Sequence, residues 1–163
     1  ADPLNVEFTF NEYHQFVETV VGKHAGRIHS TAGDGVIAVF DEPANAYAAS
    51  KQLLGGLFEF NAFRNRVERP IELRAGMHVG SVLAPGQDAT SVNFAHVIDI
   101  AAHMQKECPI GCLVVSEPAA AYLPGGPDAV GEERVSVHDV KGVIWRPRHK
   151  IDPTPVSGQI GIE

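Results

Sequence analysis

The sequence is poor in several residues that mark common classes of protein. Its 163 residues include 2 cysteines and 1 tryptophan, and aromatic side chains make up 7% of the chain. Cys108 and Cys112 stand alone, with no second Cys or His pair at ligand spacing, which excludes a structural zinc site and favours reduced thiols. No apolar run approaches the roughly 20 residues that span a membrane, and no signal peptide is apparent, so we expect a cytoplasmic protein.

Positive charge is also scarce. The chain has 13 Lys and Arg against 20 Asp and Glu, a net charge of −7, and no predicted element carries a basic stripe. This balance argues against nucleic acid as a partner, because nucleic-acid binding rests on basic surfaces. With 44% hydrophobic residues, the length suits one domain with its own core, expected at 1–150, followed by a Pro- and Gly-rich flexible tail at 151–163.

The most informative motif is Gly33-Asp34-Gly35, which lies between two apolar-rich runs at 27–30 and 36–40. Glycines with this spacing favour the positive φ angles of a tight turn, so the segment predicts a β-hairpin with Asp34 at its tip. Two interpretations of Asp34 stay open. A carboxylate held on rigid strands suits a divalent cation, and an aspartate that serves only the turn is the commoner case.

Apolar spacing elsewhere predicts alternating strands and helices. Further strands are expected at 4–10, 70–77, 79–82, 113–115, 133–140 and 143–148, and helices at 11–25, 43–60, 93–106 and 116–123. Asn11 and Ser116 are the expected N-caps, a Gly/Pro loop is expected at 124–131, and the last two strands are expected to turn at Lys141-Gly142. Gly55-Gly56 is a candidate kink. Recurring hairpins among helices indicate an α+β sandwich, with helices against one face of a mostly antiparallel sheet.

Four segments, taken in order, resemble those of the class III adenylate/guanylate cyclase catalytic domain. They are 24–27 with 33–40, then 73–82, then 111–123, and finally 140–143. The resemblance extends from about residue 13 to residue 150 and implies a ferredoxin-like core. It also implies a dimer, a homodimer or a heterodimer with another cyclase domain, that converts ATP or GTP to a cyclic nucleotide and pyrophosphate with Mg²⁺ or Mn²⁺. Domains of this family are often fused to sensors or membrane segments, so the chain could be the cytosolic part of a longer protein.

The resemblance also implies site residues, and here the chain departs from the family pattern. Asp34 matches the second metal-binding aspartate, and Gly33 is the hairpin glycine. Ser30 stands where an adenine-selecting Lys is usual. Asp99 takes the place of the ribose-orienting Asn, and His103 that of the transition-state Arg. Asp99 and His103 are therefore the candidate catalytic residues, and Ser30 and Gly33 the candidate nucleotide-binding residues.

Other family residues are replaced or absent. The Asp-x-x-Gly-Phe motif that carries the first metal-binding aspartate is not found before Asp34, the base-selecting Asp falls near Val92, and Ala95 replaces a usual Gly. These changes favour a degenerate domain with a regulatory, nucleotide-sensing or dimerisation role. The alternatives are an active cyclase whose missing half-site comes from a partner, and an unrelated α+β binding domain.

Two further histidine patterns have a simpler explanation. His96, Asp99 and His103 share one helical stripe, which could form a metal site but more commonly forms a solvated or dimer-facing surface. Arg74 and His78 alternate with apolar neighbours along an expected strand, a pattern that we interpret as structural.

Overall fold

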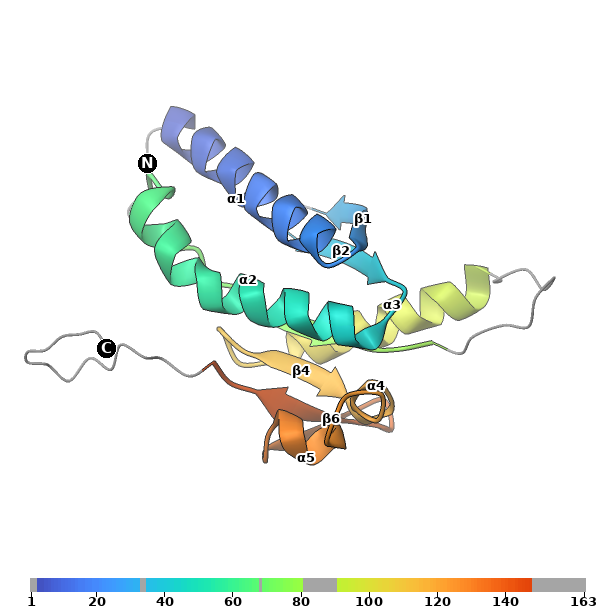
Figure 1. The fold of residues 1–163 in the computed structure, drawn as a ribbon. Helices are drawn as coiled ribbons and strands as arrows, with labels where there is room; N and C mark the ends of the chain where they lie inside the picture. Colours follow the sequence, from blue (N-terminus) through green and yellow to red (C-terminus); the bar gives the residue numbers. More distant parts are fainter. Residues whose placement is uncertain (1–2, 33–34, 68, 81–90, 148–163) are drawn as a thin grey trace, which may run out of the picture.

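The computed structural model describes residues 3–32, 35–67, 69–80 and 91–147. In chain order the elements are α1 (Pro3–Lys23), β1 (Gly26–Ala32), β2 (Gly35–Phe40), α2 (Pro43–Phe63), β3 (Ala75–Met77), α3 (Ser91–Lys106), β4 (Leu113–Ser116), α4 (Glu117–Ala120), α5 (Gly126–Val130), β5 (Arg134–Val137) and β6 (Val140–Trp145). The long helices α1 and α2 lie side by side. The larger sheet, with the short helices α4 and α5, lies on the side of α2 that faces away from α1 (Figure 1).

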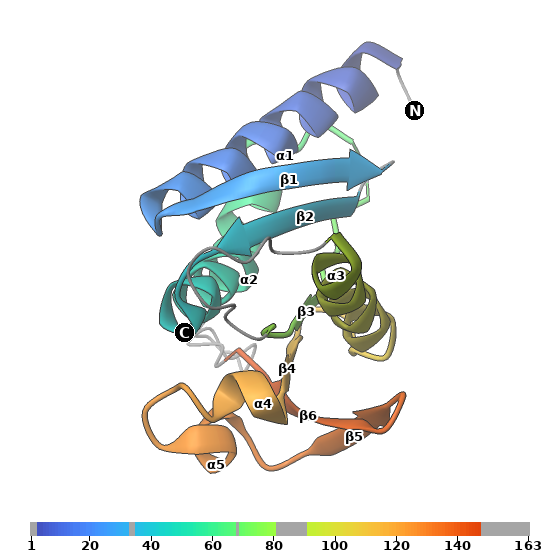
Figure 2. The same cartoon turned by 90° about the vertical axis from the view of Figure 1, so that its right-hand side faces the viewer.

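The strands form two sheets. The hairpin β1-β2 is antiparallel, and the second sheet has the order β3-β4-β6-β5, with β3 and β4 parallel and the other pairs antiparallel. Figure 2 shows the hairpin beside α1 and the larger sheet below it, with α3 next to β3. The expected α+β class with a mostly antiparallel sheet is confirmed.

Three apolar clusters hold these layers together. One joins α1 and α2 to the inner face of the hairpin through Tyr13, Val17 and Phe60. The second fills the space among α2, the strands β3, β4 and β6, and the short helices, and the third packs α3 against β4, β5 and β6. Central strand β4 is buried along its whole length, as expected for a strand covered on both faces.

The strand expected at 4–10 is wrong, because this segment is the first part of α1. Thr9, Tyr13 and Val17 are buried at a spacing of four residues, whereas Val6 and Phe10 are exposed. The segment thus continues the buried stripe of the helix through Thr9, and the alternation of Val6, Phe8 and Phe10 does not mark a strand. Asn11 lies inside the helix and is not its N-cap.

The strand expected at 70–77 is shorter than predicted and covers only Ala75–Met77. Asn61 on α2 takes the place of a strand partner for Ile71. Its side chain accepts a hydrogen bond from the Ile71 N–H at 2.7 Å and donates to the Ile71 carbonyl at 3.0 Å. Val79 lies outside any strand, and residues 81 and 82 of the next expected strand lie outside the described residues. Helix α2 continues through Gly55 and Gly56.

The closing hairpin forms, but its turn lies earlier than predicted. Val137 pairs with Val140, so His138 and Asp139 make the turn, and both have positive φ angles. Gly142 lies inside β6, where an added Cβ would come within 2.8 Å of a Val114 methyl carbon. This glycine serves close packing, not turn formation. The loop expected at 124–131 contains the short helix α5.

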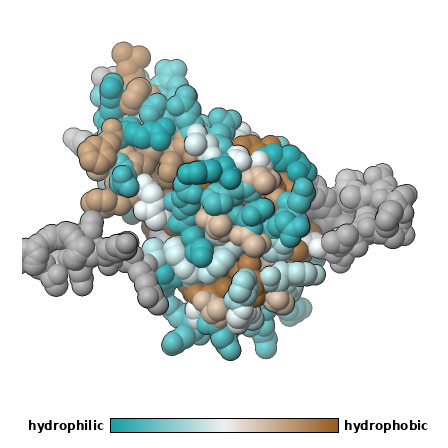
Figure 3. All heavy atoms as spheres, in the orientation of Figure 1, coloured by the Kyte–Doolittle hydropathy of each residue, from teal (hydrophilic) through white to brown (hydrophobic). Residues whose placement is uncertain are grey.

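The surface has apolar side chains at one end of the helix pair. Figure 3 shows them over the end where α1 begins and α2 ends, and Leu4, Phe10 and Phe63 are among the exposed large apolar residues. No helix in the described part of the chain is both long and apolar enough to cross a membrane.

Candidate functional site

Helix α3 carries the two candidate catalytic residues, and its inner face fixes their position. Ile100 and Met104 are almost completely buried and pack against the β4-β6 surface. Gly76 on β3 lets the helix come close, because a Cβ there would overlap the Ala101 carbonyl oxygen and the Gln105 nitrogen. Close packing of backbone on backbone leaves the opposite face of α3 in a defined place on the domain.

Asp99 lies on that outer face, and His103, one turn later, lies at its edge. Asp99 Oδ1 is 3.4 Å from His103 Nε2, and their side chains are 64% and 34% exposed. The two residues form an ion pair whenever the imidazole is protonated. The structure therefore brings the two candidate catalytic residues together, and it pairs them with each other.

The hairpin holds the other candidate residues. Ser30 lies on β1 just after a register shift, opposite Ile37, and its Oγ is 3.2 Å from His29 Nδ1. Gly33 and Asp34 lie outside the described residues, between the paired residues Ala32 and Gly35. The predicted hairpin is confirmed. Within the described ranges, no hydrogen bond or ion pair joins Ser30 to Asp99 or His103.

A metal site finds little support in the part of the chain that the structure describes. No group of three or more His, Cys, Asp and Glu residues there could hold a metal ion. The stripe of His96, Asp99 and His103 is thus not assembled into a ligand set. Asp34 would be a single carboxylate, and two-metal catalysis needs ligands for both ions.

A partly buried polar contact that the motifs did not indicate lies at the ends of β3 and β4. His78 Nδ1 is 2.7 Å from Ser116 Oγ, and this oxygen also accepts a hydrogen bond from the Ala119 N–H, which caps α4 as predicted. Burial lowers the pKa of His78, and His96 lowers it further through charge repulsion. These contacts agree with a structural role for His78. His78 and Ser116 are 38 positions apart in the sequence, and no sequence motif indicated that their side chains would meet.

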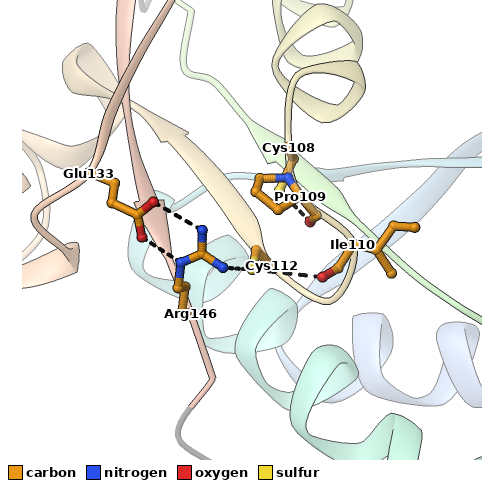
Figure 4. A network of polar contacts seen from close by, with 6 residues as sticks. All are labelled: Cys108, Pro109, Ile110, Cys112, Glu133 and Arg146. Carbon is orange, nitrogen blue, oxygen red and sulfur yellow. Dashed lines mark hydrogen bonds and ion pairs between the residues drawn. The ribbon is translucent and has the colours of Figure 1, made fainter.

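The thiols form part of a second polar network (Figure 4). Arg146 Nη2 donates to Glu133 at 2.9 Å, and its Nη1 lies 3.6 Å from Cys112 Sγ. The Arg146 guanidinium holds the pKa of the Glu133 carboxyl below its usual range. Burial raises the pKa of Cys108 to about 11, so both this thiol and Cys112 stay protonated at neutral pH.

An open hollow lies next to this network. It has a volume of about 680 Å³, and its lining includes Lys51 of α2 together with Trp145 and Arg146 of the β6 end. None of the candidate residues lines it. The site predicted from the sequence is therefore an exposed helix face and a hairpin, not this hollow.

Comparison with known proteins links this geometry to one family of folds. No family model matches the chain. The chain is 28% identical over 138 residues to "Putative adenylate cyclase 3" of Rhizobium meliloti, a match that covers 84% of this chain and 22% of that protein. It thus spans about a fifth of the length of this curated relative.

Solved structures give the fold. The dimeric guanylyl cyclase domain of the RhoGC fusion protein from Blastocladiella emersonii matches with a TM-score of 0.66 and 13% identity, covering 88% of this chain and 82% of that one. An adenylate/guanylate cyclase/hydrolase from Silicibacter pomeroyi matches with a TM-score of 0.63 and 22% identity, covering 90% and 86%. These likenesses show that the chain shares its fold with these cyclase domains. The chain has the fold of class III adenylate/guanylate cyclase catalytic domains.

Proposed function

We propose that this chain is a degenerate cyclase-homology domain that binds a nucleoside triphosphate, or a second cyclase domain, without ordinary turnover. The ion pair between Asp99 and His103 is the observation that carries the proposal. These residues stand where the resemblance expects an Asn and an Arg. A domain that retains the cyclase fold but has different residues at these two positions of α3 suits a regulatory or nucleotide-sensing role.

The chemistry of the pair is poorly suited to cyclisation. An Arg guanidinium offers a permanent charge and a planar pair of donors to phosphate oxygens, which an imidazole does not. The charge of His103 depends on protonation, and Asp99 lies 3.4 Å from it and compensates that charge. The Asp99 carboxylate also adds negative charge to the face that would meet a polyphosphate, which raises the electrostatic free energy of that approach.

The binding of divalent ions is the next question. Cyclases of this class are expected to use Mg²⁺ or Mn²⁺, and Asp34 is the candidate ligand. The residues described do not form a set that fits two ions. Asp34 lies outside the described residues, so the proposed function is limited to nucleotide or partner binding.

Dimerisation is the other half of the proposal. A related guanylyl cyclase domain is described as dimeric, and another, from Catenaria anguillulae, was solved with GTP. Exposed apolar side chains such as Leu4 and Phe63 are of the kind that protein contacts bury. We propose a homodimer or a heterodimer with another cyclase domain, with ATP or GTP as the ligand.

An active cyclase is the second candidate. The β1-β2 hairpin is present, with Ala32 and Gly35 paired on either side of residues 33 and 34. The paired strands on either side of these residues support this candidate. A partner domain that supplies the missing residues would then complete the site.

Cyclase assays of the purified chain distinguish these candidates. We expect no cyclic nucleotide above a protein-free blank from ATP or GTP with either Mg²⁺ or Mn²⁺, while equilibrium titration detects nucleotide binding. The double variant Asp99→Asn with His103→Arg is the matched control that restores the family residues on α3. Turnover by the unmodified chain that Asp34→Ala abolishes would overturn the proposal and establish the active cyclase.

A further inference from the structure

The turn between β5 and β6 is conformationally unusual. His138 and Asp139 are its two central residues, with φ angles of 48° and 66°. A two-residue hairpin with both φ angles positive is favoured by Asn-Gly or Asp-Gly sequences. Neither position here is a glycine, so the turn keeps a histidine in a backbone conformation that L-residues seldom adopt.

The side chain of His138 meets a specific neighbour. Its ring centroid lies 4.3 Å from that of His103 on α3, and the two planes are inclined by 74° in an edge-to-face arrangement. Favourable aromatic pairs share this edge-to-face orientation, and the two rings lie slightly closer than the roughly 4.5–7 Å usual for such pairs. The contact links the tip of the hairpin directly to one of the candidate catalytic residues.

The surrounding packing holds this contact in place. Val137 and Val140, on either side of the turn, pack in the same apolar cluster as Ile100 and Met104 of α3. The hairpin and the helix therefore form one packed unit below the two rings. His103 is approached by His138 from the hairpin and by Asp99 from its own helix.

We propose that His138 is a positioning residue, whose left-handed backbone places its ring against His103 so that the imidazole keeps one orientation on the nucleotide-binding face. This inference rests on the proposed function, in which the outer face of α3 meets the phosphates of ATP or GTP. Backbone conformations of this kind persist where the surrounding structure holds them, and they are concentrated at functional sites.

Fixing the ring matters because of the chemistry of imidazole. An imidazole has only two nitrogens, and Nε2 of His103 faces Asp99. Only the doubly protonated ring can donate from both nitrogens, and Nδ1 is then the atom left to donate to a phosphate oxygen, provided that the ring already lies in the right plane. A ring held by contacts on two sides loses less rotational freedom when it meets a ligand, so the ligand binds more tightly.

Two variants separate the ring from the turn. His138→Asn removes the ring and keeps a residue that tolerates the left-handed conformation, and Asp139→Gly relaxes the turn and keeps the ring. We expect His138→Asn to shift the imidazole proton and carbon signals of His103 in NMR spectra and to weaken MgATP or MgGTP binding about threefold to tenfold, by analogy with the loss of one oriented side chain. We expect Asp139→Gly to change neither.

The outcomes are distinct from those that test the proposed function. Binding by His138→Asn equal to that of the unmodified chain, or His103 signals that do not move, overturns the positioning role. If the unmodified chain binds neither MgATP nor MgGTP, the nucleotide-binding part of the proposed function fails, and the His103 signals alone then decide whether His138 orients that ring. Amide spectra of the α3 cluster show that both variants are folded, and His103→Gln assigns the signals.

Discussion

Gly76 offers the sharpest test of how the candidate site is built. Adding one methyl group by Gly76→Ala would place it on the Ala101 carbonyl oxygen and the Gln105 nitrogen, 3.0 Å from the Gln105 Cα. All three atoms belong to the backbone of α3, so no side chain can rotate away. The helix must move off β3, and Asp99 and His103 move with it.

The size of the effect follows from this geometry. Overpacking a well-packed core costs about 1–3 kcal/mol, and a clash with rigid backbone belongs in the upper part of that range. In a domain of this length, each kcal/mol lowers Tm by about 2–4 °C, so we expect a fall of about 4–12 °C. The interior of α2 supplies the opposite case, since a Cβ at Gly55 would meet nothing within 4 Å. There, Gly55→Ala should gain about 0.5–1 kcal/mol from helix propensity.

Urea unfolding followed by circular dichroism measures both variants. The expected result is a lower midpoint for Gly76→Ala and a higher one for Gly55→Ala, with unchanged slopes that show a change in stability alone. The reasoning would be refuted if Gly76→Ala unfolded within about 0.5 kcal/mol of the unmodified chain, the usual scatter for neutral substitutions. Equal destabilisation by both variants would refute it as well, since backbone atoms block the added methyl group at Gly76 and nothing blocks it at Gly55.

Three further predictions concern buried polar groups. Ser116→Ala removes both the cap on the Ala119 N–H and the partner of His78, and we expect urea unfolding to show a loss of about 1–2 kcal/mol. The pKa of His78 is lower in the folded chain than its usual 6.5, so the unfolded chain binds more protons at acidic pH. The free energy of unfolding should therefore fall as pH drops below about 6.5. His78→Gln should flatten that dependence between about pH 7.5 and 5.5. The pKa of Cys108 rises from 9.0 to about 11, which reduces the thiolate fraction of this residue roughly 100-fold. Ellman's reagent should therefore label Cys108 and Cys112 slowly in the folded chain at about pH 8 and rapidly in guanidinium. Fast labelling without denaturant would contradict the burial of the two thiols.

The site was only partly predictable from the residues. The spacing of Asp99 and His103 places them one turn apart on any helix, so their pairing could be anticipated from the sequence alone. The partner of His103 from the hairpin could not. His138 is 35 positions further along the chain, and the predicted turn at Lys141-Gly142 directed attention away from it.

Local preference determined much of this protein. Glycine spacing set the β1-β2 hairpin, apolar spacing set α2 and α3, and a serine before a proline-containing turn set the start of α4, because each depends on neighbours within a few residues. Only tertiary structure decided the rest. The segment at 4–10 became helical because α1 buries Thr9 with Tyr13 and Val17, and the closing turn moved to His138 because Gly142 is needed where β6 packs against Val114. In each case, burial against a segment distant in the sequence outweighed a weak local pattern.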